Sequence, residues 1–493
     1  MKARRAALAG LVLALISGCS LQPVYERPAA PVANAFPSGA AYKSAQGGTT
    51  LPAGDIGWRD FLRDARLQRL VEIALANNRD LRVAVLNVEQ VRAQYRIQRA
   101  ALYPQVGGFA DASRTRTAAG ISSSGTAVTA QTFEVGVQAS WEIDFFGRLR
   151  SLSAAALQQY FASAYARQAA EILLVSQVAD QYLTLLAFDE QMQVTQQTTV
   201  TAKASYDIVK LQFDTGTGTE LAVQQARTVV ELANANYAAQ VRGRAQAENG
   251  LVLLIGQPLP ADLPQAVRLD VQQILADVPE GLPSDLLTRR PDILRAEALL
   301  LSENANIGAA RAAFFPTISL TGTLGTGSAA LSGLFGAGSS FWSIIPSLTV
   351  PIFNAGQLKA ELDVVKIQKD IGIAQYEKAI QTAFSEVANG LAARGTFDDQ
   401  VAATERYTAA QQRAFDLSTF RYRNGVDNYL TVLTAQTGLY DAQLTLVSTR
   451  LQRLTNLVDL YRALGGGWIQ TTGDEPRPAD TVAAGAPMHA SDR

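Results

Sequence analysis

The chain has 493 residues, and its 43 lysines and arginines nearly balance 44 aspartates and glutamates, for a formal net charge of −1. This balance gives no support for binding to nucleic acid or to an anionic membrane surface. The only cysteine is Cys19 and the only histidine is His489. The body of the chain therefore excludes a disulfide, a Cys/His metal cluster, and a catalytic pair built on cysteine or histidine.

The first residues resemble a secretory signal. Basic residues precede an apolar run over 7–16, which is too short to remain as a membrane-spanning helix. The sequence Ile16-Ser17-Gly18-Cys19 resembles a bacterial lipobox, so residues 1–18 would be removed and acyl chains attached to Cys19. A plain signal peptide with an incidental cysteine is the alternative, but the absence of any other cysteine favours the anchor. Ser20, and not an aspartate, follows the cysteine, so the resemblance to bacterial lipoproteins implies sorting to the outer membrane.

The first half predicts a linker, a strand hairpin and very long helices. Residues 19–63 are rich in Pro, Ala, Gly and Ser and indicate a lipid-anchored extended linker. After a helix from 64 to 102, residues 106–143 predict a β-hairpin, because apolar and polar residues alternate strictly from Phe133 onward. Residues 147–255 lack proline and predict a helical hairpin, whose first arm of roughly 65 residues would reach about 100 Å.

The same plan recurs in the second half, which indicates a tandem repeat. RAALYP at 99–104 matches RAAFFP at 311–316 at a separation of 212 residues, and Gly216 matches Gly425 at a separation of 209. The predicted parts are a first repeat (64–258), a connector (259–283), a second repeat (284–464, with a β-hairpin at 317–352 and a helical hairpin at 356–464), and a disordered tail (465–493).

The strands indicate a membrane barrel that several copies share. Each strand is about ten residues long with one apolar face, which is the pattern of outer-membrane strands. Four strands cannot close a barrel, and an open edge in lipid would leave backbone groups unpaired. Several copies must therefore contribute, most simply with cyclic symmetry. The alternative is a soluble four-stranded sandwich with coiled-coil arms, although the secretory signal and the Ser/Gly-rich hairpin loops favour the membrane.

Four motifs occur in an informative order: WEIDFFGR at 141–148, RRPDI at 289–293, RAAFFP at 311–316 and LGGGW at 464–468. Together they resemble the outer-membrane factor family, which includes TolC and OprM, and within it the NodT-type efflux lipoproteins. The resemblance implies an α+β membrane protein: a homotrimer that shares a 12-stranded outer-membrane β-barrel and a long periplasmic α-helical coiled-coil barrel.

The resemblance also implies a function. The chain would be the passive outer-membrane duct of a tripartite efflux system in a Gram-negative bacterium, with a periplasmic adaptor and an inner-membrane RND transporter as partners. No catalysis is expected, and no cofactor is expected besides the acyl chains on Cys19.

The two helix-hairpin tips are the first predicted site. The first tip contains Thr215, Gly216 and Gly218, and the second contains Asn424 and Gly425. Glycine permits a tight turn between helices. The resemblance implies that these tips form the periplasmic mouth and dock the adaptor, whereas the simpler interpretation is that they are only turns.

The predicted gate departs from the family. In OprM-like relatives the helix after the second tip carries a leucine, an aspartate four residues later and an arginine three residues further. These positions are Leu430, Thr434 and Thr437 here, so both charges are missing. Our hypothesis is closure by apolar packing of Leu430 and Tyr429, with Asp427 as the nearest acid. The alternative is that Leu430 is an ordinary coiled-coil core residue.

Two other functions are weighed against the channel. A lipid-anchored periplasmic coiled-coil adaptor or scaffold would fit the anchor and the long helices, but adaptors lack two such strand hairpins. A periplasmic enzyme that uses carboxylates would need a paired acidic motif, and the acids here are scattered along the helices. No Gly-rich loop has the spacing of a nucleotide site.

Overall fold

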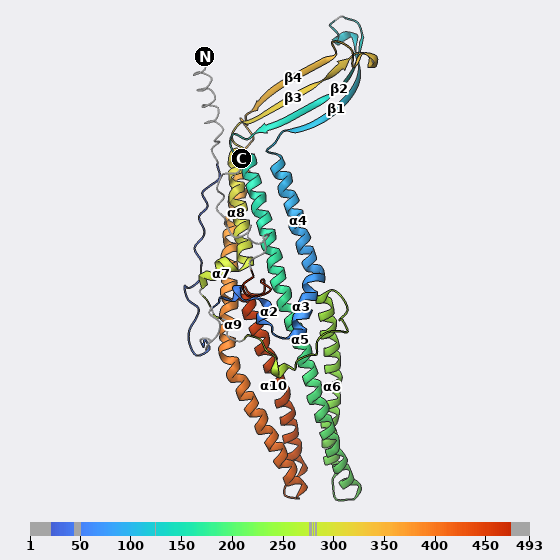
Figure 1. Cartoon of the computed structure of the whole chain (residues 1–493), viewed down its shortest axis with the longest axis vertical. Helices are drawn as coiled ribbons and strands as arrows, with labels where there is room; N and C mark the ends of the chain where they lie inside the picture. The colour runs from blue at the N-terminus through green and yellow to red at the C-terminus, as the bar shows by residue number, and fades with distance from the viewer. Residues whose placement is uncertain are drawn as a thin grey trace. The chain divides into compact units, whose positions relative to one another are not determined.

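The computed structural model describes residues 21–43, 51–123, 125–275, 279, 281 and 283–474. Cys19, the predicted signal peptide and the tail from 475 onward lie outside the described residues. The chain forms two compact units, and each unit draws on both repeats (Figure 1). Of the described residues, those within 21–29, Asn87–Ser163 and Arg295–Tyr376 belong to the first unit, and those within Ala30–Leu86, Ala164–Leu294 and 377–474 belong to the second.

The first unit contains a four-stranded antiparallel sheet whose strands are neighbours in the order of the chain. The second hairpin was expected to reach residue 352, but its last strand ends at Thr349; Pro351, which has no N–H, stands two residues further on. The sheet therefore has two edge strands, the first and the last. The four strands are β1 (Gln105–Thr117), β2 (Val128–Ile143), β3 (Thr317–Ser328) and β4 (Ser340–Thr349).

The register separates an apolar face from a polar face. Successive side chains in a strand point to opposite sides, and directly paired residues share a side. The polar face carries mainly side chains with hydroxyl, amide or carboxylate groups, and its apolar exceptions include Phe109, Phe341 and Ile345. The apolar face joins Phe133, Val135, Val137, Ala139, Trp141 and Ile143 of β2 to Ile318, Leu320 and Leu324 of β3 and to Trp342, Ile344 and Leu348 of β4.

The helices show the repeat directly. Each hairpin of strands is preceded by a helix of 22 residues and followed by one of 67 residues. Such lengths need long proline-free stretches, which the sequence provides in both halves. The helices are α4 (Arg79–Ala100), α5 (Arg148–Asp214), α6 (Glu220–Ile255), α8 (Pro291–Ala312), α9 (Gln357–Arg423) and α10 (Tyr429–Ala463).

Shorter helices complete the core of the second unit. Residues 53–61, expected as part of an extended linker, instead form two short helices with a buried apolar side. Phe61 is fully buried and stacks on Tyr461 with 3.9 Å between ring centroids. Asp64 caps the next helix and also accepts a 3.0 Å hydrogen bond from the Tyr182 hydroxyl. The short elements are η1 (Ala53–Asp55), α2 (Trp58–Phe61), α3 (Ala65–Asn77), η3 (Leu269–Val271) and α7 (Pro283–Arg289).

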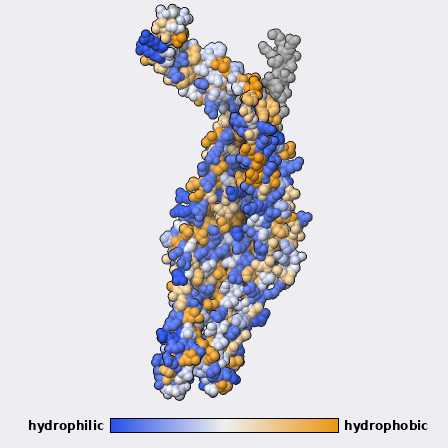
Figure 2. Space-filling model, turned by 180° about the vertical axis from the view of Figure 1, so that it is seen from behind, coloured by the Kyte–Doolittle hydropathy of each residue, from blue (hydrophilic) through white to orange (hydrophobic). Residues whose placement is uncertain are grey.

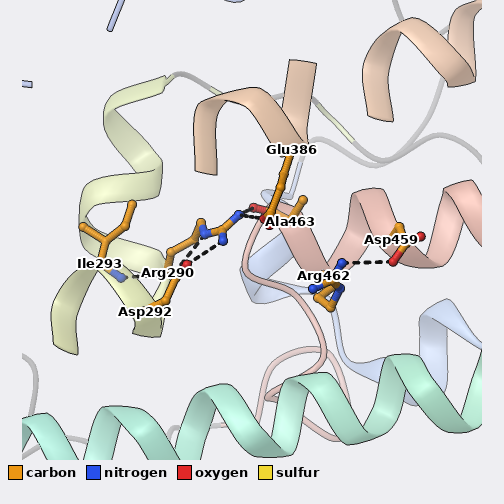
Figure 3. Close-up of polar contacts among 7 residues, drawn as sticks. All are labelled: Arg290, Asp292, Ile293, Glu386, Asp459, Arg462 and Ala463. Carbon is orange, nitrogen blue, oxygen red and sulfur yellow. Dashed lines mark hydrogen bonds and ion pairs between the residues drawn. The ribbon is translucent and has the colours of Figure 1, made fainter. Parts of the chain in front are cut away.

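Within the second unit, buried Arg290 fixes the start of α8 (Figure 3). Its Nη2 donates to Asp292 Oδ2 at 2.6 Å, and its Nη1 donates to Glu386 Oε2 at 2.7 Å and to the Ala463 carbonyl at 3.0 Å. One guanidinium thereby joins three helices. The RRPDI motif thus performs a structural role.

Within the first unit, the beginning of the linker runs along α8. Arg27 forms an ion pair with Glu297 at 2.7 Å. The Asn304 side chain donates to the Pro23 carbonyl at 2.8 Å, and Arg311 donates to the Leu21 carbonyl at 3.2 Å. Among the residues described, none of the helices combines the length and the apolar character needed to cross a membrane.

Candidate functional site at the helix-hairpin tips

The two tips contain the same turn, displaced by 209 residues. The N–H of Gly216 donates to the Phe213 carbonyl at 2.9 Å, and the N–H of Gly425 donates to the Tyr422 carbonyl at 3.0 Å. The two glycines have φ values of 77° and 70°, a left-handed conformation that side chains disfavour. The turn therefore requires the glycine at both positions.

The return helices begin with matching caps. The Thr219 hydroxyl accepts a hydrogen bond from the Ala222 N–H at 3.3 Å, and the Asn428 side chain accepts one from the Thr431 N–H at 3.2 Å. Each cap satisfies an N–H that the first turn of a helix leaves unpaired. The repeat is thus conserved within the chain down to individual hydrogen bonds.

The polar tip residues that the sequence singled out are engaged within their own turns. The Thr215 hydroxyl donates to the Leu211 carbonyl at 2.9 Å, and the Asn424 amide donates to the Phe420 carbonyl at 2.7 Å. A Cβ at Gly218 would lie 2.9 Å from the Phe213 backbone nitrogen, so no side chain fits there. The exposed surface of the tips instead includes the apolar residues Leu211, Leu221, Phe420 and Val426.

Asp427 is held within its own tip. Arg421 donates to both of its carboxylate oxygens, at 2.6 and 2.9 Å. The hydrogen bond from Arg421 is the main reason that the pKa of Asp427 lies below its usual value. The nearest acid to the predicted gate is therefore neutralised by a cation six residues earlier in the same chain.

Tyr429 belongs to an apolar core that joins the two tips of one chain. Its side chain is 7 % exposed and packs in a cluster with Val209 and Val223 of the first hairpin. Burial, followed by the nearby Tyr422, raises the pKa of Tyr429 to about 12. The Tyr422 hydroxyl adds a 2.6 Å hydrogen bond to the Gln212 side chain across the two hairpins.

Leu430 has different surroundings from Tyr429. Its side chain is 52 % exposed, so it is not a core residue of its own chain. The hydroxyls of Thr434 and Thr437 donate to the carbonyls of Leu430 and Leu433, one turn earlier, at 2.9 and 3.0 Å. The sequence grouped these positions as a gate, whereas the structure places Leu430 on the surface and Tyr429 in the core.

Sequence reasoning missed the contact between the two tips. Gln212 and Tyr422 are 210 positions apart, and neither belongs to a motif that suggests a pair. The apolar spacing around Val209 and Val223 indicates buried helix faces but not which helix covers them. In the described parts of the chain, no group of three or more His, Cys, Asp or Glu residues is arranged to hold a metal ion.

Comparison with known proteins decides the family. Residues 70–257 and 282–466 match the outer membrane efflux protein family. The chain belongs to this family. It is 48 % identical over 467 residues to the toluene efflux pump outer membrane protein TtgC of Pseudomonas putida, covering 94 % of this chain and 96 % of TtgC. It is 43 % identical over 466 residues to the outer membrane protein OprJ of Pseudomonas aeruginosa, with 94 % and 96 % covered.

A solved structure supports the same assignment. The open state of the MtrE outer membrane channel of Neisseria gonorrhoeae matches with a TM-score of 0.84 and 41 % identity, over 92 % of this chain and 100 % of MtrE. The predicted family, fold class, outer-membrane location and efflux function of this outer membrane efflux protein are thereby confirmed. The relatives are efflux-channel proteins rather than enzymes or adaptors.

Proposed function

We propose that three copies of this chain form a passive exit duct for small molecules, with one shared barrel in the outer membrane and a helical tube below it. The duct receives its cargo from an inner-membrane RND transporter through a periplasmic adaptor. The similarity to a toluene efflux component supports small, apolar cargo. Acyl chains on Cys19 anchor the mature chain.

The observation that carries the proposal is the four-stranded sheet with two open edges and one apolar face. Lipid cannot hydrogen-bond to an open edge. Pairing β4 of one copy with β1 of the next satisfies both edges without any other element. Three copies then give twelve strands in a closed barrel, with the apolar face toward lipid and the polar face toward the lumen.

We further propose that the tips are the regulated end of the duct. Leu430 is the exposed apolar side chain at the predicted constriction, and Tyr429 supports it from the core behind. Three copies of Leu430 would meet at the axis and close the lumen by excluding water. The exposed apolar residues of the tips provide the surface on which an adaptor docks.

Crosslinking tests the shared barrel. Single cysteines at Val106 in β1 and at Leu348 in β4 are combined in one chain and treated with thiol crosslinkers of graded length. We expect dimers and trimers from the double variant and monomers from each single variant, because only neighbouring copies bring β1 to β4. A mature protein that stays monomeric and water-soluble without detergent would contradict the barrel.

A second experiment tests the docking surface. A photo-crosslinking amino acid is placed at Val426, at Leu211, or at the control position Arg406 on α9, in intact cells. We expect the two tip positions to capture a periplasmic adaptor, identified by mass spectrometry. Capture of nothing beyond other copies of this chain would remove the tips as a docking site.

A further inference from the structure

The hairpin end of the sheet carries two arginines on its apolar face. Arg114 and Arg116 of β1 are two positions apart, so their side chains leave the sheet on the same side. They pair directly with Gln131 and Thr129 of β2. Every second residue of β1 points to the same side, so the arginines share their side with Val106 and with Ala139 of β2, which pairs with Val106. The arginines therefore lie on the face that the proposed barrel turns toward lipid.

The charge of the two arginines is not balanced on this face. Both side chains are exposed, and neither has a hydrogen bond or ion pair with any described residue. The acids of the sheet are Asp111, Glu134 and Glu142, and their positions place all three on the polar face. The apolar face of the four strands thus has a net positive charge confined to one end.

The position of the arginines matches the boundary of the hydrocarbon layer. The apolar run of β2 from Phe133 to Ile143 covers about 33 Å of strand, and a tilt of about 40° reduces this to a height of about 25 Å. That height equals the apolar band of outer-membrane barrels. The next row toward the loops contains Arg114 and Gln131, followed by Arg116 and Thr129.

The arginines lie at the end of the sheet away from the helices. The strands meet α4, α5, α8 and α9 at one end, and the two hairpin loops occupy the other (Figure 1). Figure 2 shows a strongly hydrophilic patch at the hairpin end. With the helices in the periplasm, this end reaches the outer leaflet. Pairing of β1 with another copy would not cover the arginines, because side chains stand perpendicular to the sheet.

We propose that Arg114 and Arg116 form a binding site for the phosphate groups of an outer-leaflet lipid headgroup. Arginine binds phosphate through two parallel hydrogen bonds, and its apolar stem can lie along the barrel wall while the guanidinium reaches the headgroup. The inference rests on the proposed barrel, which would present three such sites around its outer rim.

Lipid binding to the full-length, detergent-purified protein tests the proposal. Diphosphoryl lipid A is compared with its monophosphoryl form, with diacylglycerol, which has no phosphate, and with inorganic phosphate, by native mass spectrometry. We expect the double variant R114Q/R116Q to bind diphosphoryl lipid A about tenfold or more weakly than the wild type. The matched control R406Q/R413Q removes two exposed arginines from α9 and should bind like the wild type.

A second variant separates charge from folding. R114K/R116K keeps both charges but loses the paired geometry, so it should bind more weakly than the wild type and more tightly than the glutamine variant. Equal binding of wild type and R114Q/R116Q to diphosphoryl lipid A would overturn the proposal, as would equal binding of wild type to lipids with and without phosphate. If instead the wild type is a soluble monomer, the barrel itself is wrong.

Discussion

Leu430 and Tyr429 are consecutive residues with opposite surroundings, and this difference assigns them different roles. Tyr429 fills the core between the two hairpins, while Leu430 is exposed in the single chain. A residue that closes a lumen in an assembly must be free of its own core. On this criterion Leu430 is the candidate for closure, and Tyr429 is the candidate for holding the tip in shape.

Replacement of Leu430 with alanine should raise the single-channel conductance in a planar bilayer. The smaller side chain widens the constriction and admits water where three leucines would exclude it. Leu221 is the equivalent residue of the first hairpin, 209 positions earlier, and is also exposed, so Leu221→Ala is the matched control. Unchanged conductance in Leu430→Ala would discard the gate assignment.

Replacement of Tyr429 should destabilise the tip in proportion to the volume removed. Tyr429→Ala deletes a buried aromatic ring and should cost about 3 kcal/mol or more, whereas Tyr429→Phe keeps the ring and should cost far less. Hydrogen exchange of the amides around 209–226 and 422–433 measures this locally. Equal exchange in both variants would show that the ring does not support the tip.

The half-buried side chain of Asp180, whose Oδ1 is fully covered, predicts a pH dependence of stability. Burial, followed by the charge of Asp459, raises the pKa of Asp180 to about 7 from a usual value of 3.8. The folded state therefore binds more protons than the unfolded state between these values, so stability falls as pH rises from about 4 to about 7. The shift of about three units sets an upper limit of about 4 kcal/mol.

Asp180→Asn should remove this dependence. The variant should be more stable than the wild type at pH 8, and the difference should shrink toward pH 5, as measured by the midpoint of thermal unfolding in detergent. Asp207→Asn replaces an exposed acid of the same helix and should leave the pH profile unchanged. A difference between Asp180→Asn and the wild type that is constant with pH would contradict the assignment.

At the scale of elements, two acidic residues lie directly opposite each other on the polar face of the sheet. Asp111 of β1 pairs directly with Glu134 of β2. Like charges directly opposite repel each other, so the pair costs stability unless cations lie nearby. In the proposed barrel, three copies would line one level of the lumen with these carboxylates.

The double variant D111N/E134Q should reduce the preference of the open channel for cations. Removal of the carboxylates lowers the local concentration of cations in the lumen. The reversal potential under a potassium chloride gradient measures the preference. Arg114→Gln changes charge on the opposite face and should leave the reversal potential unaltered. The lumen assignment fails if the two variants behave alike.

The sequence predicts the long elements better than the contacts between them. Alternation from Phe133 to Ile143 and the proline-free stretches predict strands and helices, because both depend on local pattern. The short helices at 53–61 depend instead on burial against distant residues, as Phe61 does on Tyr461. The tip glycines were predictable from turn chemistry, whereas the separate surroundings of Tyr429 and Leu430 depend on which helix packs against them.

At the scale of the whole molecule, the repeat gives the chain two arms of equal length. α5 and α9 each have 67 residues, and the two tips are joined by Tyr422 and Gln212. The hydrogen bond can form only if both arms bring their ends to the same level. The seven residues 408–414 of α9 and 199–205 of α5 are equivalent under the offset of 209 residues.

Shortening one arm should therefore be more harmful than shortening both. Deletion of 408–414 together with the matching seven residues of α10 moves the second tip alone by about 10 Å. Deletion of the equivalent residues from both hairpins keeps the tips level. We expect export in cells to be lost in the first case and partly retained in the second, as measured by growth in the presence of a toxic compound that the wild type exports. Equal loss in both cases would show that the level of the tips is not what matters.

The equal lengths of α5 and α9 also restrict how the length of the stalk can change. A periplasm of different width needs a longer or shorter stalk, yet a single insertion misaligns one tip with the other. We expect functional changes in stalk length to be insertions or deletions of whole helical turns that occur at equivalent positions in both halves. Because of the internal duplication, the length of the periplasmic stalk is encoded separately in the two halves of the chain, and a change of length requires the same change in both.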